Sequence, residues 1–170
     1  RDGTSEGSPE DDFRWEFSTM PHALSLDGDG DYVYVSGFSW PTGGEVTVEF
    51  WTKVNTEDIG VRSAFGVGEL DDPNRFQAHV PWSDKIIYWD YGNEYEDGRV
   101  AADYSNYLDK WTHVALVSEG NGGTFMGIYL DGVLVASSST SDGPDVPLSG
   151  LWIGQWLSEH HKGIIDEFRI

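Results

Sequence analysis

Hydrophobic and polar residues alternate through the middle of the chain, in the pattern of β-strands that bury one face. Residues 110–138 hold three such runs, at 111–117, 125–130 and 133–137, separated by Gly-Asn-Gly-Gly and by Asp131-Gly132. Asp-Gly favours the positive φ angles of a tight hairpin turn. We therefore expect three neighbouring antiparallel strands here, and the apolar positions on both faces of 111–117 suggest a strand that is covered on both sides.

Short alternating or β-branched runs continue on either side of this meander. They cover residues 22–27, 32–35, 45–53, 62–68, 75–80, 85–91, 151–156 and 163–170. The first two flank the turn at 28–31 and predict a hairpin, whereas the polar stretch 92–105 predicts a long loop. No segment has a convincing helical period. The pattern predicts an all-β fold, a two-sheet antiparallel β-sandwich of the jelly-roll type.

The N-terminal segment differs from the rest of the chain in composition. Residues 1–12 contain charge, Gly, Ser and Pro but nothing to bury, whereas 13–17 (FRWEF) alternate in the manner of a strand. We interpret 1–21 as an arm or linker with a possible edge strand. That strand would lie either on its own domain or on the sheet edge of a neighbouring subunit, which would be self-association through the arm. Residues 22–170 form the folded domain.

Charge and composition limit the kinds of partner that the chain can bind. Thirty acidic against ten basic residues give a formal charge of -20, which disfavours nucleic acid and anionic membrane surfaces and favours cations. No run approaches the roughly 20 apolar residues of a membrane helix, so no membrane insertion is expected. Cysteine is absent, so disulfides cannot stabilise the domain.

Six segments, taken in their order along the chain, are similar to one known family. They are ALSLDGDGDYVYV, EVTVEFWTKV, KWTHVALV, IYLDGVLVAS, LWIGQ and GIIDEFRI. Over about residues 22–170 the chain resembles the laminin-G-like, or concanavalin A-like, jelly-roll domains of secreted bacterial proteins. The resemblance implies a two-sheet sandwich, frequent calcium, an extracellular or cell-surface location, and a role as a carbohydrate-binding or adhesion module.

An Asp-rich turn is the candidate metal site. Asp27, Asp29 and Asp31 lie two residues apart, a spacing that can direct carboxylate oxygens at one hard cation such as Ca²⁺. In similar jelly rolls the acidic residue of the closing segment, here Asp166, lies near this turn. We therefore expect a Ca²⁺ site formed by these four residues. The alternative is that the aspartates only accept local amide hydrogen bonds and shape the turn.

A ligand site is indicated by the mixture of aromatic and acidic residues between 79 and 99. Trp156 adds a further aromatic side chain from a later loop. Sugars stack on aromatic faces and bond to carboxylates or amides, so these residue types suit carbohydrate. The alternation also places Trp89 and Tyr91 on the opposite face from Asp90, so one of the two sets must be core. The alternative is that most of these aromatics pack between the sheets. The candidate ligand residues are Trp82, Trp89, Asp90, Tyr91, Tyr95 and Trp156.

Catalysis is not expected. The Glu-x-Asp-x-x-Glu string that supplies paired carboxylates in many sandwich glycosidases does not occur. We therefore predict a non-catalytic, extracellular, calcium-stabilised, lectin-like module that binds carbohydrate or another surface ligand. The alternative is a structural, self-assembling subunit of an extracellular filament, layer or adhesin.

Overall fold

The computed structural model describes residues 23–68 and 72–170. The predicted strand at 13–17 and the arm proposed for self-association lie outside these residues. The described part is all-β, apart from three single-turn 3₁₀ helices (η1, Thr56–Asp58; η2, Asp72–Asn74; η3, Ser105–Tyr107). The strands are β1 (Leu24–Asp27), β2 (Val33–Trp40), β3 (Val46–Lys53), β4 (Phe65–Val67), β5 (Arg75–His79), β6 (Ile86–Gly92), β7 (Arg99–Asp103), β8 (Thr112–Ser118), β9 (Met126–Leu130), β10 (Val133–Ser138), β11 (Leu148–Ile153), β12 (Gln155–Trp156), β13 (Glu159–His160) and β14 (Lys162–Arg169).

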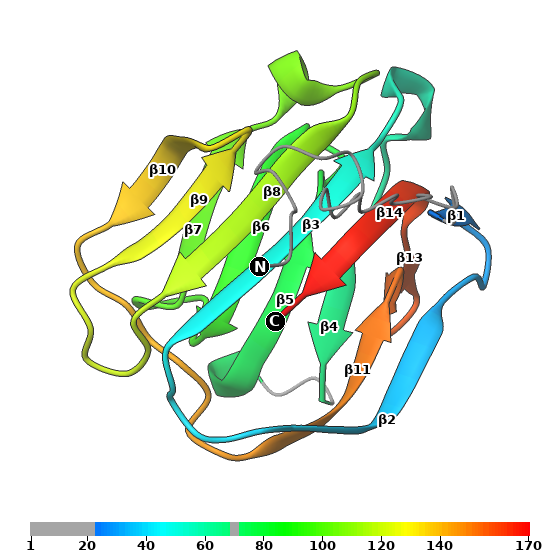
Figure 1. Ribbon diagram of the computed structural model, residues 1–170. Coiled ribbons are helices and arrows are strands. Elements are labelled where there is room, and N and C mark those ends of the chain that lie inside the picture. The colour runs from blue at the N-terminus through cyan, green and yellow to red at the C-terminus, as the bar shows by residue number, and fades with distance from the viewer. Residues whose placement is uncertain (1–22, 69–71) are drawn as a thin grey trace, which may run out of the picture.

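Two six-stranded antiparallel sheets pack face to face (Figure 1). The first sheet has the order β1-β14-β3-β8-β9-β10, and the second has the order β2-β11-β4-β5-β6-β7. Strands β12 and β13 form a separate short hairpin. The first and last described strands, β1 and β14, are neighbours in the first sheet, with Leu24 opposite Ile165. This is the predicted jelly-roll type of sandwich.

The core lies between the two sheets and follows the alternation of the sequence. Phe50 from β3 and Leu116 from β8 face Phe65, Phe76 and further side chains from the second sheet, and all four are fully buried. Phe65 lies edge-on to Phe50, with ring centroids 6.2 Å apart, and edge-on to Phe76 at 6.0 Å. Edge-to-face aromatic pairs of this kind add specificity to the packing beyond the area they bury.

The predicted meander is confirmed, because β8, β9 and β10 lie side by side in the first sheet. The expectation that its first strand is covered on both sides is wrong. Thr112, Val114, Leu116 and Ser118 are buried, whereas the alternate residues of β8 are only half-buried on the outer face of the first sheet. A strand with one solvated face is the usual arrangement in an antiparallel sandwich.

Two local predictions are also wrong. Strands β1 and β2 do not form a hairpin, because β1 pairs with β14 in the first sheet and β2 pairs with β11 in the second. The turn at 28–31 therefore crosses between the sheets. The stretch 92–105 is not one long loop, since β7 pairs with β6 along its length and buries Val100. This strand was not predicted because it is short and begins and ends with charged residues, Arg99 and Asp103, so its alternation is weak.

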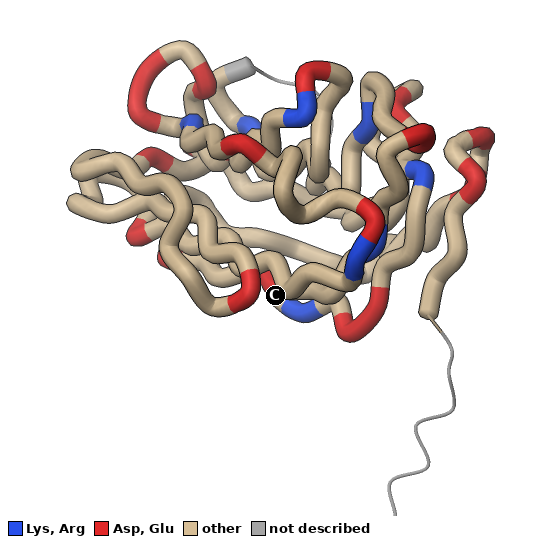
Figure 2. Tube along the Cα trace, turned by 90° about the horizontal axis from the view of Figure 1, so that it is seen from above, with Lys and Arg blue, Asp and Glu red and all other residues tan. Residues whose placement is uncertain are grey.

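Charges concentrate where the strands end. Figure 2 shows Asp and Glu mostly on loops and turns. Such an arrangement leaves the core free of unpaired charge while giving the surface its strongly negative potential. No helix among residues 23–68 and 72–170 is long and apolar enough to cross a membrane.

Candidate functional site

Polar side chains cover the outer face of the second sheet where β5, β6 and β7 lie side by side. Along β5, Phe76 and Ala78 point into the core, so Arg75, Gln77 and His79 point outward. The neighbouring strands add outward-facing residues in the same way. The result is a cluster of charged and amide side chains on a rigid platform of hydrogen-bonded strands.

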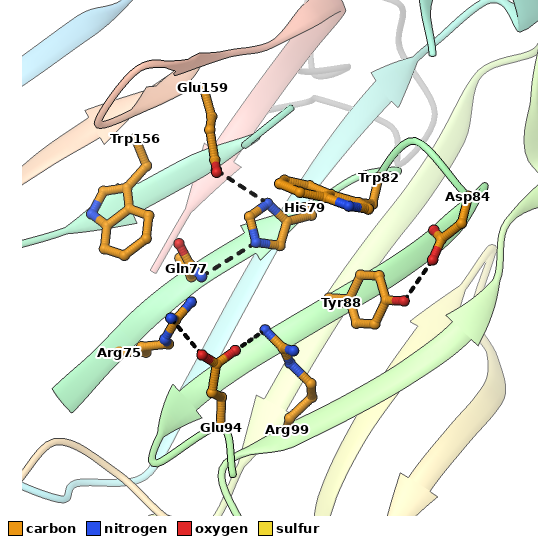
Figure 3. Close-up of a pocket in the computed structure, with 10 residues that line it drawn as sticks. All are labelled: Arg75, Gln77, His79, Trp82, Asp84, Tyr88, Glu94, Arg99, Trp156 and Glu159. Carbon is orange, nitrogen blue, oxygen red and sulfur yellow. Dashed lines mark hydrogen bonds and ion pairs between the residues drawn. The ribbon is translucent and has the colours of Figure 1, made fainter. Parts of the chain in front are cut away.

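A pocket of about 300 Å³ lies on this face, and we call it the β5–β6 pocket (Figure 3). A volume of this size matches the lower end of known small-molecule sites, which run from about 300 Å³ upward. Its walls combine two indole rings with acidic, basic and amide groups. The lining residues are Arg75, Gln77, His79, Trp82, Asp84, Tyr88, Glu94, Arg99, Trp156 and Glu159.

The short β12–β13 hairpin forms one wall of the pocket. Trp156 lies so close to Gly66 of β4 that a Cβ atom built at Gly66 would be 1.9 Å from its Cδ1 atom, so only glycine fits there. The Trp156 indole Nε1 donates to the Gly68 carbonyl at 3.4 Å. On the same hairpin, Glu159 accepts a 2.5 Å hydrogen bond from the buried Ser63 hydroxyl. These contacts fix both side chains over the sheet.

Two arginines and two carboxylates form an ion-pair network beneath and beside the pocket. Asp90 is fully buried and accepts from Arg99 Nε at 2.5 Å and from Arg99 Nη2 at 2.6 Å, a bidentate pair. Arg75 lies 3.8 Å from Asp90 and 2.5 Å from Glu94, which also pairs with Arg99. Burial lowers and the Asp90 carboxylate raises the pKa of Arg99, and the net shift is upward.

His79 and Gln77 join this network to the hairpin. His79 Nδ1 lies 2.9 Å from the Arg62 carbonyl oxygen, and its Nε2 lies 3.3 Å from the Gln77 amide nitrogen. Burial lowers the pKa of His79, so the ring is neutral at pH 7. It then donates from Nδ1 to Arg62 and accepts at Nε2. The 3.6 Å separation from Glu159 is therefore not an ion pair at neutral pH.

Aromatic rings complete the far end of the pocket. Trp82 lies edge-on to His79, with ring centroids 4.4 Å apart, and its half-buried indole faces the cavity (Figure 3). The Tyr88 hydroxyl donates to Asp84 at 2.7 Å, and this hydrogen bond, with burial, raises the pKa of Tyr88. The Arg99 guanidinium stacks over the Tyr88 ring at 5.0 Å. The pocket thus has an indole at each end and a polar floor.

The structure brings together some of the residues that the sequence pointed to and separates others. Trp82 and Trp156 line the β5–β6 pocket, and Asp90 lies beneath it. Trp89 and Tyr91 are fully buried between the sheets, so their assignment as ligand residues is wrong. The alternation along β6 turns them inward, as the alternative interpretation held. Tyr95 is 76 % exposed on the loop after β6 and is not among the residues that line the pocket.

Sequence reasoning missed Arg75, Gln77, His79 and Arg99 as site residues. The signal for the first three was present in RFQAH at 75–79, where a polar residue occupies every second position of a predicted strand, whereas Arg99 fell in the predicted loop. A row of three polar side chains on one face of a strand that is otherwise core marks either solvent or a site. Only the pairing with β6 and β7 shows that several such rows converge.

The four proposed calcium ligands do not converge. Asp27 Oδ1 accepts from the Asp29 amide at 2.8 Å and Asp31 Oδ2 accepts from the Asp27 amide at 3.3 Å, so both shape the turn. The strand register places Asp27 opposite Lys162, four residues from Asp166. At ~3.3 Å per residue, that separates Asp166 from the turn by roughly 13 Å. Among the described residues, no group of three or more His, Asp or Glu side chains is arranged to hold a metal ion.

Calcium stabilisation stays a prediction, and a thermal melt with added Ca²⁺ and again with chelator tests it. If the 27–31 turn binds calcium alone, Asp27→Ala should abolish any calcium-induced rise in Tm, because a carboxylate ligand is lost. Asp166→Ala should leave that rise intact, since the register holds it away from the turn. Equal melting with and without Ca²⁺ in the unmodified protein would contradict calcium binding altogether.

The comparisons with known proteins agree with this architecture. A family model described as the concanavalin A-like lectin/glucanases superfamily matches residues 27–170. No curated protein sequence matches the chain significantly. Similar solved structures include domains LG4-5 of the mouse laminin alpha1 chain, with a TM-score of 0.62, 10 % identity, and 86 % of this chain and 40 % of that chain covered.

Two further structures show the same fold. A native heptameric SAP-like pentraxin from Limulus polyphemus has a TM-score of 0.62 and 18 % identity, with 86 % of this chain and 74 % of that chain covered. The binding domain of botulinum neurotoxin DC, solved with rat synaptotagmin II, has a TM-score of 0.60 and 16 % identity, with 89 % and 40 % covered. The chain spans two fifths of the laminin and neurotoxin chains. At these identities the structural likeness establishes the fold alone, and the family match over most of the length shows that the chain belongs to the concanavalin A-like lectin/glucanases superfamily.

Proposed function

We propose that this domain is a non-catalytic, extracellular binding module that holds a carbohydrate in the β5–β6 pocket. One observation carries the proposal: two indole rings stand at the ends of a pocket whose floor is a fixed array of amide and charged groups. Sugar rings present C–H faces that stack on indoles and hydroxyls that pair with such groups. Flat strands hold the array in place, so little ordering is needed when a ligand binds.

Binding without cleavage is supported because three of the four carboxylates at the pocket are held in ion pairs or by a tyrosine hydroxyl. Asp90 and Glu94 are tied to Arg75 and Arg99, and Asp84 accepts from Tyr88. Carboxylates held in this way are structural acceptors rather than free acid–base groups. Similar folds also serve in binding domains, such as the receptor binding domain of botulinum neurotoxin D. An extracellular location is the expectation for a domain of this family.

Replacing Trp82 with alanine should remove binding while leaving the fold intact, because Trp82 is half-buried and lines the pocket rather than the core. We expect a loss of at least tenfold in affinity, since aromatic contacts at buried interface positions are worth about 2 kcal/mol or more. The measurement is retention of the protein on a glycan array and in affinity electrophoresis through polysaccharide gels.

The matched control is Trp51→Ala. Trp51 is 38 % exposed on the outer face of the first sheet, so it tests the loss of a surface indole away from the pocket. Both variants should melt within a few degrees of the unmodified protein. Unchanged retention in Trp82→Ala would refute the proposed site. Loss of retention only in Trp51→Ala would in addition place the binding surface on the first sheet.

A further inference from the structure

The side-chain oxygen of Gln77 is a buried acceptor without a donor. Gln77 is fully buried, and its amide nitrogen donates to Asp90 Oδ2 at 2.8 Å and lies 3.3 Å from His79 Nε2. Both amide hydrogens are thereby used. Among the residues that the structure describes, none donates to the oxygen, Oε1. A buried acceptor left unpaired costs about 1–3 kcal/mol, so a group that donates a hydrogen bond to it from the pocket would remove this cost.

The orientation of the Gln77 amide is fixed by its neighbours. Rotating the amide by half a turn would place its oxygen against the Asp90 carboxylate, where two acceptors would repel each other. It would also bring that oxygen against Nε2 of the neutral His79 ring, which is an acceptor as well. The oxygen therefore faces the side of the pocket occupied by Trp156 and Glu159 (Figure 3).

Three donors beside the pocket are already engaged within the protein. Arg99 donates to Asp90 and pairs with Glu94, Tyr88 donates to Asp84, and the Trp156 indole donates to Gly68. Acceptors remain. Glu159 uses Oε2 to accept from Ser63. Its other carboxylate oxygen, Oε1, is a second acceptor on the hairpin side of the cavity, beside the unpaired Gln77 Oε1. A ligand that satisfies these two acceptors must donate hydrogen bonds to them.

The charge around the pocket also disfavours an anionic ligand. The two lining arginines are matched by Asp90 and Glu94, which leaves Asp84 and Glu159 as net negative charge at the pocket. The whole chain adds a formal charge of -20. An anionic group would enter a site with no unmatched arginine to receive it, and like charges at close range cost affinity.

We propose, resting on the carbohydrate-binding function above, that the β5–β6 pocket selects neutral sugars. A sugar hydroxyl donates to Gln77 Oε1, and a second donates to Glu159, while the ring lies between Trp82 and Trp156. Sugars that carry a carboxylate, sulfate or phosphate on the bound residue are rejected. The discrimination comes from acceptors fixed by the protein rather than from the size of the pocket.

The test is an array that pairs neutral glycans with their uronate, sulfated or phosphorylated derivatives. The neutral member of each bound pair should bind at least tenfold more tightly than its acidic derivative, at low and at high salt. If only acidic glycans bind, the selectivity is refuted while carbohydrate binding stands. If no glycan binds, the proposed function itself fails, so the two failures are distinguishable.

Two variants separate the roles of the acceptors. Glu159→Gln keeps the size of the side chain and an oxygen for Ser63, and it should reduce the discrimination against acidic derivatives about tenfold. The control, Glu167→Gln on β14 of the first sheet, should leave this discrimination unchanged.

Gln77→Met should weaken neutral-sugar binding about tenfold by removing the acceptor. Because Gln77→Met also removes a donor to Asp90, its melt is measured alongside. An unchanged discrimination ratio in Glu159→Gln would overturn the proposed role of Glu159.

Discussion

Replacing Asp90 with alanine should lower the free energy of unfolding by about 3–5 kcal/mol, the typical cost of removing one partner from a buried ion pair. Asp90 is fully buried and is the only described residue that bonds Arg99 through both Nε and Nη2 while also accepting from Gln77. Its loss leaves Arg99 with Glu94 alone and leaves the Gln77 amide without its main acceptor. Urea unfolding at neutral pH measures the change.

Glu96→Ala is the matched control, because Glu96 is an exposed acid on the loop that follows β6. Removing an exposed charge should change stability by no more than about 0.5 kcal/mol. A loss below about 1 kcal/mol in Asp90→Ala would mean that water or Glu94 compensates the arginines, and the rigid floor inferred for the pocket would not exist. Binding should fall with stability, since Gln77 loses the contact that orients it.

Acidification should destabilise the domain between about pH 6.5 and pH 4, chiefly through His161. This side chain is fully buried, and neither ring nitrogen has a hydrogen-bond partner among the described residues. Burial, assisted by the positive charge of Arg62 and opposed by Asp58, lowers its pKa from 6.5 to about 4. The neutral ring is therefore strongly preferred in the folded state.

The sign follows from proton binding. Above pH 6.5 the ring is neutral in both the folded and the unfolded state, so it does not change the free energy of unfolding. Between pH 6.5 and pH 4 the unfolded chain binds a proton on this ring and the folded chain does not. Stability therefore falls as the pH falls, and the loss is complete near pH 4. A shift of this size corresponds to about 3 kcal/mol. Burial also lowers the pKa of His79, which adds a loss of the same sign.

The measurement is urea unfolding at a series of pH values, compared between the unmodified chain and His161→Gln. The variant should lose part of the pH slope, whatever its stability at neutral pH, because the titrating group is gone. His113→Gln serves as control, since His113 is only half-buried, and it should keep the slope. Identical slopes in His161→Gln and the unmodified chain would show that the ring is solvated.

Much of the fold was predictable because burial in a sandwich imposes a period of two on the sequence. The meander of β8, β9 and β10 followed from alternation and from a turn type that Asp131-Gly132 favours. The actual partners of β1 and β2, which are β14 and β11, could not be predicted in this way. A short Asp-Gly turn can connect neighbours or cross between layers, and the choice is made by the partner β14, far away in sequence. Local patterns carry no information about such a partner.

The site was less predictable for a related reason. Alternation along β6 shows that Asp90 and Trp89 face opposite ways, but it does not say which face is the core. Aromatic residues suit either face, so the assignment of Trp89 as a ligand residue is wrong, and its neighbour Asp90 lies beneath the pocket without lining it. The pocket itself depends on Trp156 lying over Gly66, a contact between residues 90 positions apart that only the folded chain reveals.

The place of β14 in the first sheet has a consequence for biosynthesis. Because β14 lies between β1 and β3, the sheet stays split until Lys162–Arg169 has left the ribosome. A nascent chain that lacks this strand has two unpaired edges, the inner edges of β1 and β3, with open backbone donors and acceptors. Such edges can pair with strands of other chains, so this co-translational intermediate is more prone to aggregation than the folded domain, in which β14 fills the gap. Its many surface carboxylates then act earlier than in the folded protein, by keeping unfinished chains apart.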